Sequence, residues 1–310
     1  MKTAFAFPGQ GAQKVGMGQT LADTCAAAKA VFEAADEALG MRLSSLCFSG
    51  PEEELRLTEN TQPAILAASI AALRCLEARG ARADFVAGHS LGEYSALVAA
   101  GALTFEDALR VVRQRGQFMQ EAVPAGEGAM AALLGADLET VEAVCREASE
   151  RGVCSPANIN SPNQVVVAGH KSAVEYAVTL AKQRGVRRAV MLAVSAPFHC
   201  ALMQPAAERL EPVLAGTPFA ALKVPLVTNV DAAVITSGDE ARAALVRQVA
   251  SPVRWSESVR RLADEGVTRF VELGPGKVLS GLIKQVAPGA QILNVEDAQS
   301  LEATAASVGF

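Results

Sequence analysis

The chain has 310 residues, of which 50% are hydrophobic and 20% are charged, a composition that excludes a disordered or low-complexity protein. Its 28 lysines and arginines and 33 aspartates and glutamates give a net charge of −5, which argues against nucleic acid as the main partner. The apolar runs are too short for a membrane span, and the first one, which stops at Pro8, is too short for a signal peptide. We therefore expect a protein that binds neither nucleic acid nor membranes.

Short apolar runs alternate with helical patterns along the chain, which predicts an α/β fold with a parallel sheet. Outside the middle of the chain, the expected elements in order are a strand at 3–7, a helix at 61–79 capped by Asn60 or Thr61, a strand at 84–88, helices at 93–100 and 105–122, and returning strands at 224–229 and 269–273.

The middle of the chain follows the order β-α-β-β-α-β, which is the ferredoxin-like pattern. Turn-rich segments at 124–126 and 195–197 mark its two ends. We therefore expect a small ferredoxin-like domain at 127–196, inserted into a larger, discontinuous α/β domain at 1–126 and 197–310. The expected small-domain elements are strands at 129–134, 155–160, 164–168 and 188–194, and helices at 138–151 and 171–184.

The cysteines and histidines show no cofactor pattern. The six cysteines contain no CxxC pair, and a chain of this length folds without disulfides, so we expect reduced thiols in a cytoplasmic protein. The three histidines are too scattered for an obvious metal site, and we expect no metal. The cysteines are Cys25, Cys47, Cys75, Cys145, Cys154 and Cys200, and the histidines are His89, His170 and His199.

The strongest chemical signal is Gly88-His89-Ser90-Leu91-Gly92, a G-x-S-x-G motif between a predicted strand and a predicted helix. In that setting Ser90 would lie on a sharp turn at the carboxyl end of the sheet. The backbone N–H of Leu91, at the helix start, could donate to an oxyanion. A chance match in a loop is the rival interpretation, because the motif is short, but its context favours a nucleophile.

A serine nucleophile needs a base, and elimination favours His199. His170 lies inside the small domain, and His89 adjoins the nucleophile on a turn that points neighbouring side chains apart. A histidine with a purely structural role is about equally common. No acidic residue follows a predicted strand at a convincing place, so a backbone carbonyl or an amide would orient the base in a dyad.

Two glycine-rich turns and one arginine leave alternatives open. Pro8-Gly9-Gln10-Gly11 could supply a second oxyanion donor, the Gln10 N–H, or bind phosphate, although it lacks the third glycine and the lysine of phosphate loops. Gly274-Pro275-Gly276-Lys277 leaves the same two alternatives open, but a plain strand–helix connection is the favoured interpretation. Arg115 lies in a helix, where most arginines are solvated, but a buried one would bind a carboxylate.

Six segments in order resemble the bacterial malonyl-CoA:acyl-carrier-protein transacylases, over nearly the whole chain to about Asp297. The resemblance implies an α/β-hydrolase-like domain with a ferredoxin-like insertion. The segments are Phe7-Pro8-Gly9-Gln10-Gly11, Thr61-Gln62-Pro63-Ala64, Gly88-His89-Ser90-Leu91-Gly92-Glu93-Tyr94, the helix around Arg115, Ala196-Pro197-Phe198-His199 and Pro252-Val253-Arg254-Trp255.

The same resemblance implies the chemistry. Ser90 would carry the malonyl group, and His199 would act as general base and acid. The N–H groups of Gln10 and Leu91 would form the oxyanion hole, and Arg115 would hold the malonyl carboxylate. Activity would then fall below the histidine pKa, nominally about 6.5.

The resemblance also implies two supporting residues and the partners. The main-chain carbonyl of Gln248 would orient the histidine, and Phe198 would favour malonyl over methylmalonyl. Malonyl-CoA and acyl carrier protein would be the partners of a monomer that needs no cofactor, since the thioester is a substrate and the phosphopantetheine belongs to the carrier. The malonyl group would supply fatty-acid synthesis.

Acyl carrier proteins are generally acidic, and a basic cluster close in sequence to His199 is a candidate docking edge. An ordinary solvated helix end is the rival interpretation. The cluster consists of Lys182, Arg184, Arg187 and Arg188.

Three other functions stay open at this point. A serine thioesterase or esterase on the same elbow would lose its acyl group to water without an acceptor. A silent acyl-binding or scaffold protein would form no covalent adduct. A discrete acyltransferase of a polyketide synthase would differ only in the carrier protein that it serves.

Overall fold

The computed structural model describes residues 1–194 and 196–308, so part of the predicted joint at 195–197 lies outside the described residues. Its larger sheet has the strand order β10-β9-β1-β2-β7-β8, parallel throughout except for β8, and confirms the predicted α/β class. The strands are β1 (Lys2–Phe7), β2 (Phe85–Gly88), β7 (Leu226–Val227), β8 (Val234–Ile235), β9 (Val267–Leu273) and β10 (Gln291–Val295).

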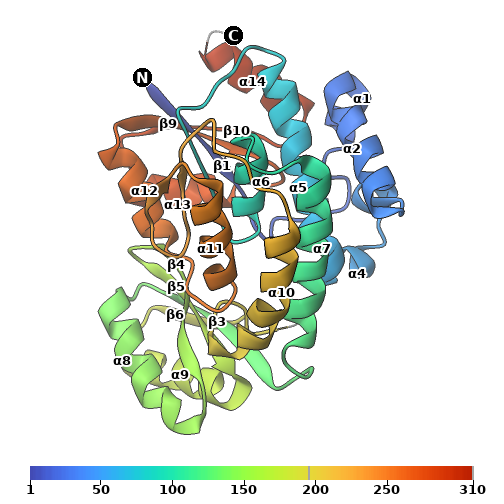
Figure 1. The fold of residues 1–310 in the computed structure, drawn as a ribbon. Helices are drawn as coiled ribbons and strands as arrows, with labels where there is room; N and C mark the ends of the chain where they lie inside the picture. Colours follow the sequence, from blue (N-terminus) through green and yellow to red (C-terminus); the bar gives the residue numbers. More distant parts are fainter. Residues whose placement is uncertain (195, 309–310) are drawn as a thin grey trace.

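Helices cover both faces of this sheet (Figure 1). They are α1 (Gln19–Thr24), α2 (Ala26–Leu39), α3 (Leu43–Ser49), α4 (Glu52–Leu55), α5 (Thr58–Glu77), α6 (Gly92–Ala99), α7 (Phe105–Glu121), η2 (Ala201–Met203), α10 (Gln204–Gly216), α11 (Gly238–Gln248), α12 (Trp255–Asp264), α13 (Val278–Val286) and α14 (Ala298–Val308).

Strand β1 is buried on both faces, as a central parallel strand requires. Phe5 and Phe7 pack into the core that contains α2, α5 and α6. Ala4 and Ala6 face the opposite core, where α12 and α13 pack. The near-continuous apolar run at the N-terminus is therefore explained by a helical layer on each side of the strand.

Helix α5 begins at Thr58, three residues before the predicted start, and the predicted cap at Asn60 or Thr61 is wrong. The Thr58 N–H instead donates to the side chain of Gln120 in α7, at 3.1 Å. The polar side chains expected to cap the helix bond back to carbonyls of α4. A tertiary contact has thus replaced the local cap, which the sequence pattern alone could not indicate.

The smaller sheet is antiparallel, with the strand order β4-β5-β3-β6. Residues 129, 131 and 133 of β3 face α8 and α9, while residues 130 and 132 face the main core. The predicted β-α-β-β-α-β order is confirmed, whereas the domain boundaries at 127 and 196 stay a prediction that the separate α8–α9 core supports. The elements are β3 (Gly128–Leu134), α8 (Leu138–Ala148), η1 (Ser149–Arg151), β4 (Cys154–Ser161), β5 (Gln164–His170), α9 (Lys171–Gln183) and β6 (Arg188–Met191).

The small sheet is tied through the backbone to a connecting segment of the large domain. The Ile159 N–H donates to the Val253 carbonyl and the Val253 N–H donates to the Ala157 carbonyl, each at 2.9 Å. These bonds join β4 to the segment before α12. They fix the small sheet beside the carboxyl end of β2, where the candidate nucleophile lies.

The prediction of six reduced cysteines is wrong for two of them. Cys25 and Cys75 form a disulfide, with Cα atoms 6.3 Å apart and 50 residues between them in sequence. Cys25 stands at the junction of α1 and α2, and Cys75 lies near the end of α5, so only the packing of α2 on α5 brings them together. Buried free thiols remain at Cys47, Cys145, Cys154 and Cys200.

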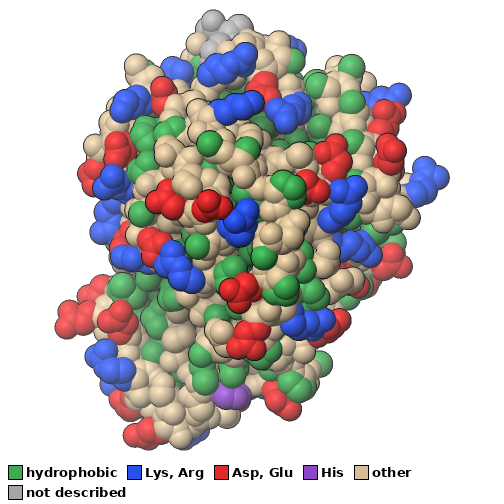
Figure 2. Space-filling model, in the orientation of Figure 1, with side chains coloured by type: hydrophobic (Ala, Val, Ile, Leu, Met, Phe, Trp, Pro, Cys, Tyr) green, Lys and Arg blue, Asp and Glu red, His purple; other side chains and the backbone are tan. Residues whose placement is uncertain are grey.

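The surface carries no segregated charge on the face drawn in Figure 2, where acidic and basic side chains are interspersed. Within residues 1–194 and 196–308, no helix combines the length and the apolar character that a bilayer crossing requires.

Candidate active site

Ser90 lies on a sharp turn between β2 and α6, with a φ of 52°, which non-glycine residues rarely adopt. The flanking glycines are required by space. A Cβ on Gly88 would lie 1.9 Å from backbone atoms of Gly92, and a Cβ on Gly92 would lie 2.0 Å from the Phe7 carbonyl oxygen. The predicted strand–turn–helix elbow is therefore present.

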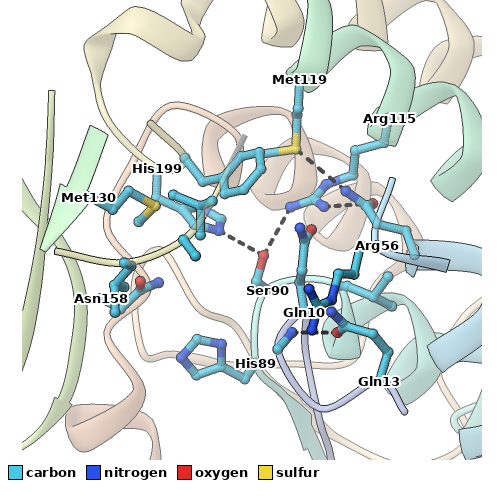
Figure 3. A pocket seen from close by; sticks show the side chains of 17 residues that line it. Gln10, Gln13, Arg56, His89, Ser90, Arg115, Met119, Met130, Asn158 and His199 are labelled. Atoms are coloured by element: carbon cyan, nitrogen blue, oxygen red, sulfur yellow. Dashed lines mark hydrogen bonds between the residues drawn. The ribbon is translucent and has the colours of Figure 1, made fainter. Parts of the chain in front are cut away.

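His199 is the histidine that reaches the serine. Its Nε2 lies 2.7 Å from Ser90 Oγ (Figure 3). Its Nδ1 lies 2.9 Å from the Gln248 carbonyl oxygen. Because a carbonyl oxygen can only accept, Nδ1 carries the proton and Nε2 presents a lone pair to the hydroxyl. This is the arrangement of a serine–histidine dyad oriented by a backbone carbonyl.

The other two histidines are engaged elsewhere. His89 Nε2 lies 2.8 Å from Asn160 Oδ1, which connects the elbow to β4. His170 Nδ1 accepts from the Val153 N–H at 2.9 Å, within the small sheet. The elimination that favoured His199 from sequence agrees with these contacts.

Burial governs the protonation of the base. His199 is 3% exposed, and desolvation, reinforced by the nearby positive charge of Arg115, lowers its pKa to about 3. The imidazole is therefore neutral in the empty site at any pH near neutrality, which is the state that a general base needs.

Asn229 supports the elbow, and sequence reasoning missed it. Its Oδ1 accepts from the Ser90 N–H at 2.6 Å, and its Nδ2 donates to the Gly88 carbonyl at 2.6 Å. Asn229 follows β7, the parallel neighbour of β2, so both reach the same edge of the sheet. The signal that could have found it is a polar residue directly after a returning strand.

Gln10 and Leu91 face the same pocket as Ser90. Among the described residues, neither backbone N–H donates a hydrogen bond. The Gln10 loop follows β1 and presses on the elbow, since a Cβ on Gly9 would lie 2.4 Å from the His89 carbonyl oxygen. Both residues line the pocket with Ser90, and their N–H groups stay candidates for the oxyanion donors.

Arg115 is only 1% exposed, so the expectation of a solvated arginine, drawn from its helix alone, is wrong. Its Nη1 donates to Gln62 Oε1 at 2.8 Å, and its Nη2 donates to Gln248 Oε1 at 2.9 Å and to Ser90 Oγ at 3.1 Å. Its Nε has no partner among the described residues. Neutral oxygens therefore surround a buried cation, and none of its hydrogen-bond partners among the described residues is a carboxylate.

Glu93 is a second residue that sequence reasoning missed. It is 1% exposed in the first turn of α6, and burial raises its pKa to about 7, opposed by hydrogen bonds from Gln248 and Asn229 and by the charge of Arg115. The signal was a glutamate three residues after the serine. Sequence alone could not tell a buried glutamate from an exposed one.

These groups line a pocket of about 800 Å³ between the elbow and the small sheet. The large domain contributes most of the polar lining. The small sheet contributes Met130 of β3, Asn158 of β4 and residues 192–194 after β6. Phe198, beside His199, is 7% exposed and also lines the pocket. The lining residues are Gln10, Gly11, Gln13, Arg56, Gln62, His89, Ser90, Leu91, Arg115, Met119, Met130, Asn158, Leu192, Ala193, Val194, Phe198 and His199.

Two sequence candidates lie outside the pocket. The basic cluster, Lys182, Arg184, Arg187 and Arg188, is exposed at the end of α9 and the start of β6, and Arg184 is paired with Glu147. Gly274-Pro275-Gly276-Lys277 connects β9 to α13, as predicted.

Comparison with known proteins places this site in a family. The acyl transferase domain family matches residues 4–303. A malonyl CoA-acyl carrier protein transacylase of Bacillus subtilis is 52% identical over 302 residues, covering 97% of this chain and 95% of the relative. The protein of that name from Escherichia coli strain K12 is 52% identical over 284 residues, covering 91% of this chain and 92% of the relative.

Solved structures agree. An acyl-carrier-protein S-malonyltransferase of Burkholderia pseudomallei is 50% identical, with a TM-score of 0.96 over 99% of this chain and all (100%) of the other. A malonyl-transacylase in complex with a type II polyketide acyl carrier protein is 46% identical, with a TM-score of 0.97 over 99% of this chain and 100% of the other. With the elbow, the dyad and the buried arginine in one pocket, the chain belongs to the acyl transferase family, among the bacterial malonyl-CoA:acyl-carrier-protein transacylases.

Proposed function

We propose that this enzyme transfers the malonyl group from malonyl-CoA to the phosphopantetheine thiol of acyl carrier protein through a malonyl ester on Ser90, and so supplies fatty-acid synthesis. One observation carries the proposal: a neutral base and a buried cation both contact the Ser90 hydroxyl, His199 at 2.7 Å and Arg115 at 3.1 Å. The base suits acyl transfer, and the cation suits an acyl group that ends in a carboxylate.

In the first half-reaction, His199 Nε2 takes the hydroxyl proton while Ser90 Oγ attacks the thioester carbonyl carbon. The oxyanion receives the N–H groups of Gln10 and Leu91. When the tetrahedral intermediate collapses, the carbon–sulfur bond breaks and the coenzyme A sulfur takes the proton from His199. The carbonyl of Gln248 holds the imidazole throughout, because the imidazolium donates to it more strongly than the neutral ring does.

In the second half-reaction, the carrier thiol gives its proton to His199 and attacks the ester carbonyl. The carbon–oxygen bond to Ser90 breaks, and Oγ recovers the proton from the imidazolium. Both half-reactions use the same base and the same oxyanion donors, so one site serves the donor and the acceptor in turn.

Arg115 would bind the malonyl carboxylate. Its present partners are amide and hydroxyl oxygens, which hold the guanidinium without neutralising it. A carboxylate would supply the missing negative charge and would release the Nη2 contact with Ser90. Phe198 would crowd an α-methyl group beside the base, so malonyl would be preferred to methylmalonyl.

The partners follow from this chemistry. Malonyl-CoA and acyl carrier protein would be the substrates of a monomer without a cofactor, since the phosphopantetheine arrives on the carrier.

A cytoplasmic location is supported by the four buried thiols, although the Cys25–Cys75 disulfide counts against it. The relative solved with a polyketide carrier favours one alternative: the same transfer to a polyketide carrier protein.

The transfer can be tested by intact-mass spectrometry after mixing the protein with malonyl-CoA. We expect an adduct of about 86 Da, the mass of the added group, that persists without an acceptor and disappears on addition of either a fatty-acid or a polyketide holo carrier protein. The variant Ser90→Ala should form none. An adduct lost to water alone would indicate a thioesterase, and no adduct on the folded protein would refute the proposal.

Acyl selectivity should depend on Arg115. In Arg115→Ala, kcat/KM for malonyl-CoA should fall roughly 30-fold to several thousand-fold, because the substrate carboxylate would be buried unpaired. This range corresponds to a loss of about 2–5 kcal/mol of transition-state stabilisation. The kcat/KM for acetyl-CoA, which has no carboxylate and serves as the control substrate, should fall much less.

Methylmalonyl-CoA should react slowly with the unaltered enzyme, because Phe198 would crowd its α-methyl group. Comparable rates with both dicarboxylic substrates would contradict the role given to Phe198.

The pH profile should differ from the one expected for an ordinary histidine. Because the pKa of His199 is lowered to about 3, the imidazole stays neutral as pH falls through 6.5. Protonation of His199 should therefore not lower the single-turnover acylation rate between pH 8 and 5. Glu93, whose pKa is raised to about 7, keeps an acceptor oxygen in both protonation states, so its titration should change the rate little and Glu93→Gln should give the same flat profile. A midpoint near 6.5 in both proteins would contradict this assignment.

The basic cluster would dock the carrier protein, as the exposure of all four side chains supports. Charge reversal in Arg187→Glu/Arg188→Glu should raise the KM for carrier protein several-fold and leave acylation by malonyl-CoA unchanged. Lys29→Glu/Arg42→Glu, which makes the same charge change on the α2–α3 side, is the control. If both double variants behave alike, the docking assignment fails.

A further inference from the structure

The side-chain amide of Gln248 joins two buried groups of opposite charge. Its Oε1 accepts from Arg115 Nη2 at 2.9 Å, and its Nε2 donates to Glu93 Oε2 at 2.8 Å and to the Ser90 carbonyl at 3.0 Å. Arg115, Gln248 and Glu93 lie on α7, α11 and α6, and none is more than 1% exposed. Water therefore does not compete for these bonds.

We propose that Glu93 is a positioning residue for Arg115 and acts on it through the Gln248 side chain. The inference rests on the proposed role of Arg115 in binding the malonyl carboxylate. It assigns to Glu93 a function in acyl selectivity, although among the described residues Glu93 is a hydrogen-bond partner of neither the serine hydroxyl nor the guanidinium.

The hydrogen-bond chemistry fixes the direction of the amide. If the Gln248 amide were turned over, its NH₂ would face the donors of Arg115, and its oxygen would face the carboxyl oxygen of Glu93. Both ends would then oppose like groups in a buried site. Glu93 and the Ser90 carbonyl thus together keep an acceptor oxygen directed at the guanidinium, and an apolar residue at position 93 would leave only the carbonyl to do so.

The same carboxyl oxygen also supports the elbow. Glu93 Oε2 accepts from the Asn229 N–H at 3.1 Å, and Asn229 Oδ1 in turn accepts from the Ser90 N–H at 2.6 Å. A buried carboxyl group costs free energy of desolvation. An apolar residue would avoid that cost, so the contribution of Glu93 lies in the acceptor that it offers to two separate N–H donors.

The two ends of the Arg115 guanidinium are held differently: Nη1 is bonded to Gln62, whereas Nη2 is bonded to Gln248, the residue that Glu93 supports. The Gln62 amide, which holds Nη1, is itself held by a weak contact from its Nε2 to the Met119 sulfur at 3.8 Å. The Gln248 amide, which holds Nη2, is anchored by a carboxyl oxygen and a backbone carbonyl. Loss of Glu93 should therefore free the Nη2 side of Arg115.

The test compares Glu93→Leu with Glu93→Gln, measuring kcat/KM for Ser90 acylation by malonyl-CoA and by acetyl-CoA. Glu93→Leu removes the acceptor, and the malonyl-to-acetyl ratio should fall about tenfold, as for one hydrogen bond to a charged group. Glu93→Gln keeps an acceptor oxygen for both N–H donors, and its ratio should stay within about threefold of the unaltered enzyme.

Two results would overturn the proposal. An equal loss with both substrates in Glu93→Leu would mean a purely structural role, because a smaller active fraction lowers both rates alike. A ratio in Glu93→Gln as low as in Glu93→Leu would mean that the charge of Glu93 acts, and not its acceptor.

Glu272→Leu is the matched control. Glu272 is fully buried and accepts from two N–H groups of α13, away from the pocket, so its loss should lower stability and leave the ratio unchanged. If Glu93→Leu does not fold, Gln248→Met cuts the same link while keeping the backbone carbonyl, and its ratio should fall in the same way; an unchanged ratio there would overturn the proposal.

Failure of the proposed function would look different. It would be seen in the unaltered enzyme, as the absence of a malonyl adduct or of any preference for malonyl over acetyl. Failure of the inference about Glu93 would leave the unaltered enzyme selective and would be seen only in the variants.

Discussion

The left-handed backbone of Ser90 is the constraint around which the site is arranged. A non-glycine residue in such a conformation costs about 1–3 kcal/mol and persists only where its surroundings hold it. Here Gly88 and Gly92 allow β1, β2 and α6 to meet without space for a Cβ, and Asn229 bonds to both sides of the turn. The hydroxyl is thereby presented at the sheet edge, between the base and the cation.

Parallel strands supply the rest of the geometry. Strands β1, β2 and β7 are neighbours and run in the same direction, so the residues that follow them, Gln10, Ser90 and Asn229, gather at one edge. The proposed nucleophile, the proposed oxyanion donor and a support for the elbow thus come from three distant parts of the chain. The carboxyl edge of a parallel sheet is where α/β proteins generally place their sites.

Buried charge decides which chemistry this edge performs. Arg115 is desolvated, and neutral oxygens hold it without compensating its charge, while the Glu93 carboxyl lies one amide away through Gln248. The same cation contributes to the low pKa of His199, which keeps the base neutral. A carboxylate-bearing acyl group would satisfy the cation, and the neutral base would serve both half-reactions. In the proposed mechanism, selectivity and catalysis would therefore share one electrostatic arrangement.

Local features of the molecule could be predicted from its sequence. Hydrophobic periodicity predicts the α/β class and the β-α-β-β-α-β segment, and the two glycines around Ser90 predict the elbow. These patterns lie within short stretches of the chain, so residues close together in sequence suffice to predict them. His199 could be favoured only by elimination. The resemblance to a known family, not the residue pattern, assigned Arg115 and Gln248.

Burial, and the pairing of segments that are distant in sequence, emerged only from the packing of the folded chain. In the folded chain Arg115 is buried, although its helix suggested that it would be solvated. Glu93 is linked to Arg115 through the Gln248 side chain, and Asn229 is bonded to the elbow. The packing also replaced the expected cap of α5 by Gln120, and it brought Cys25 to Cys75 across 50 residues. Each of these features depends on which helix packs against which face of the sheet. A linear pattern of polar and apolar residues predicts which side of a helix or strand is buried, but it does not predict which other element covers that side.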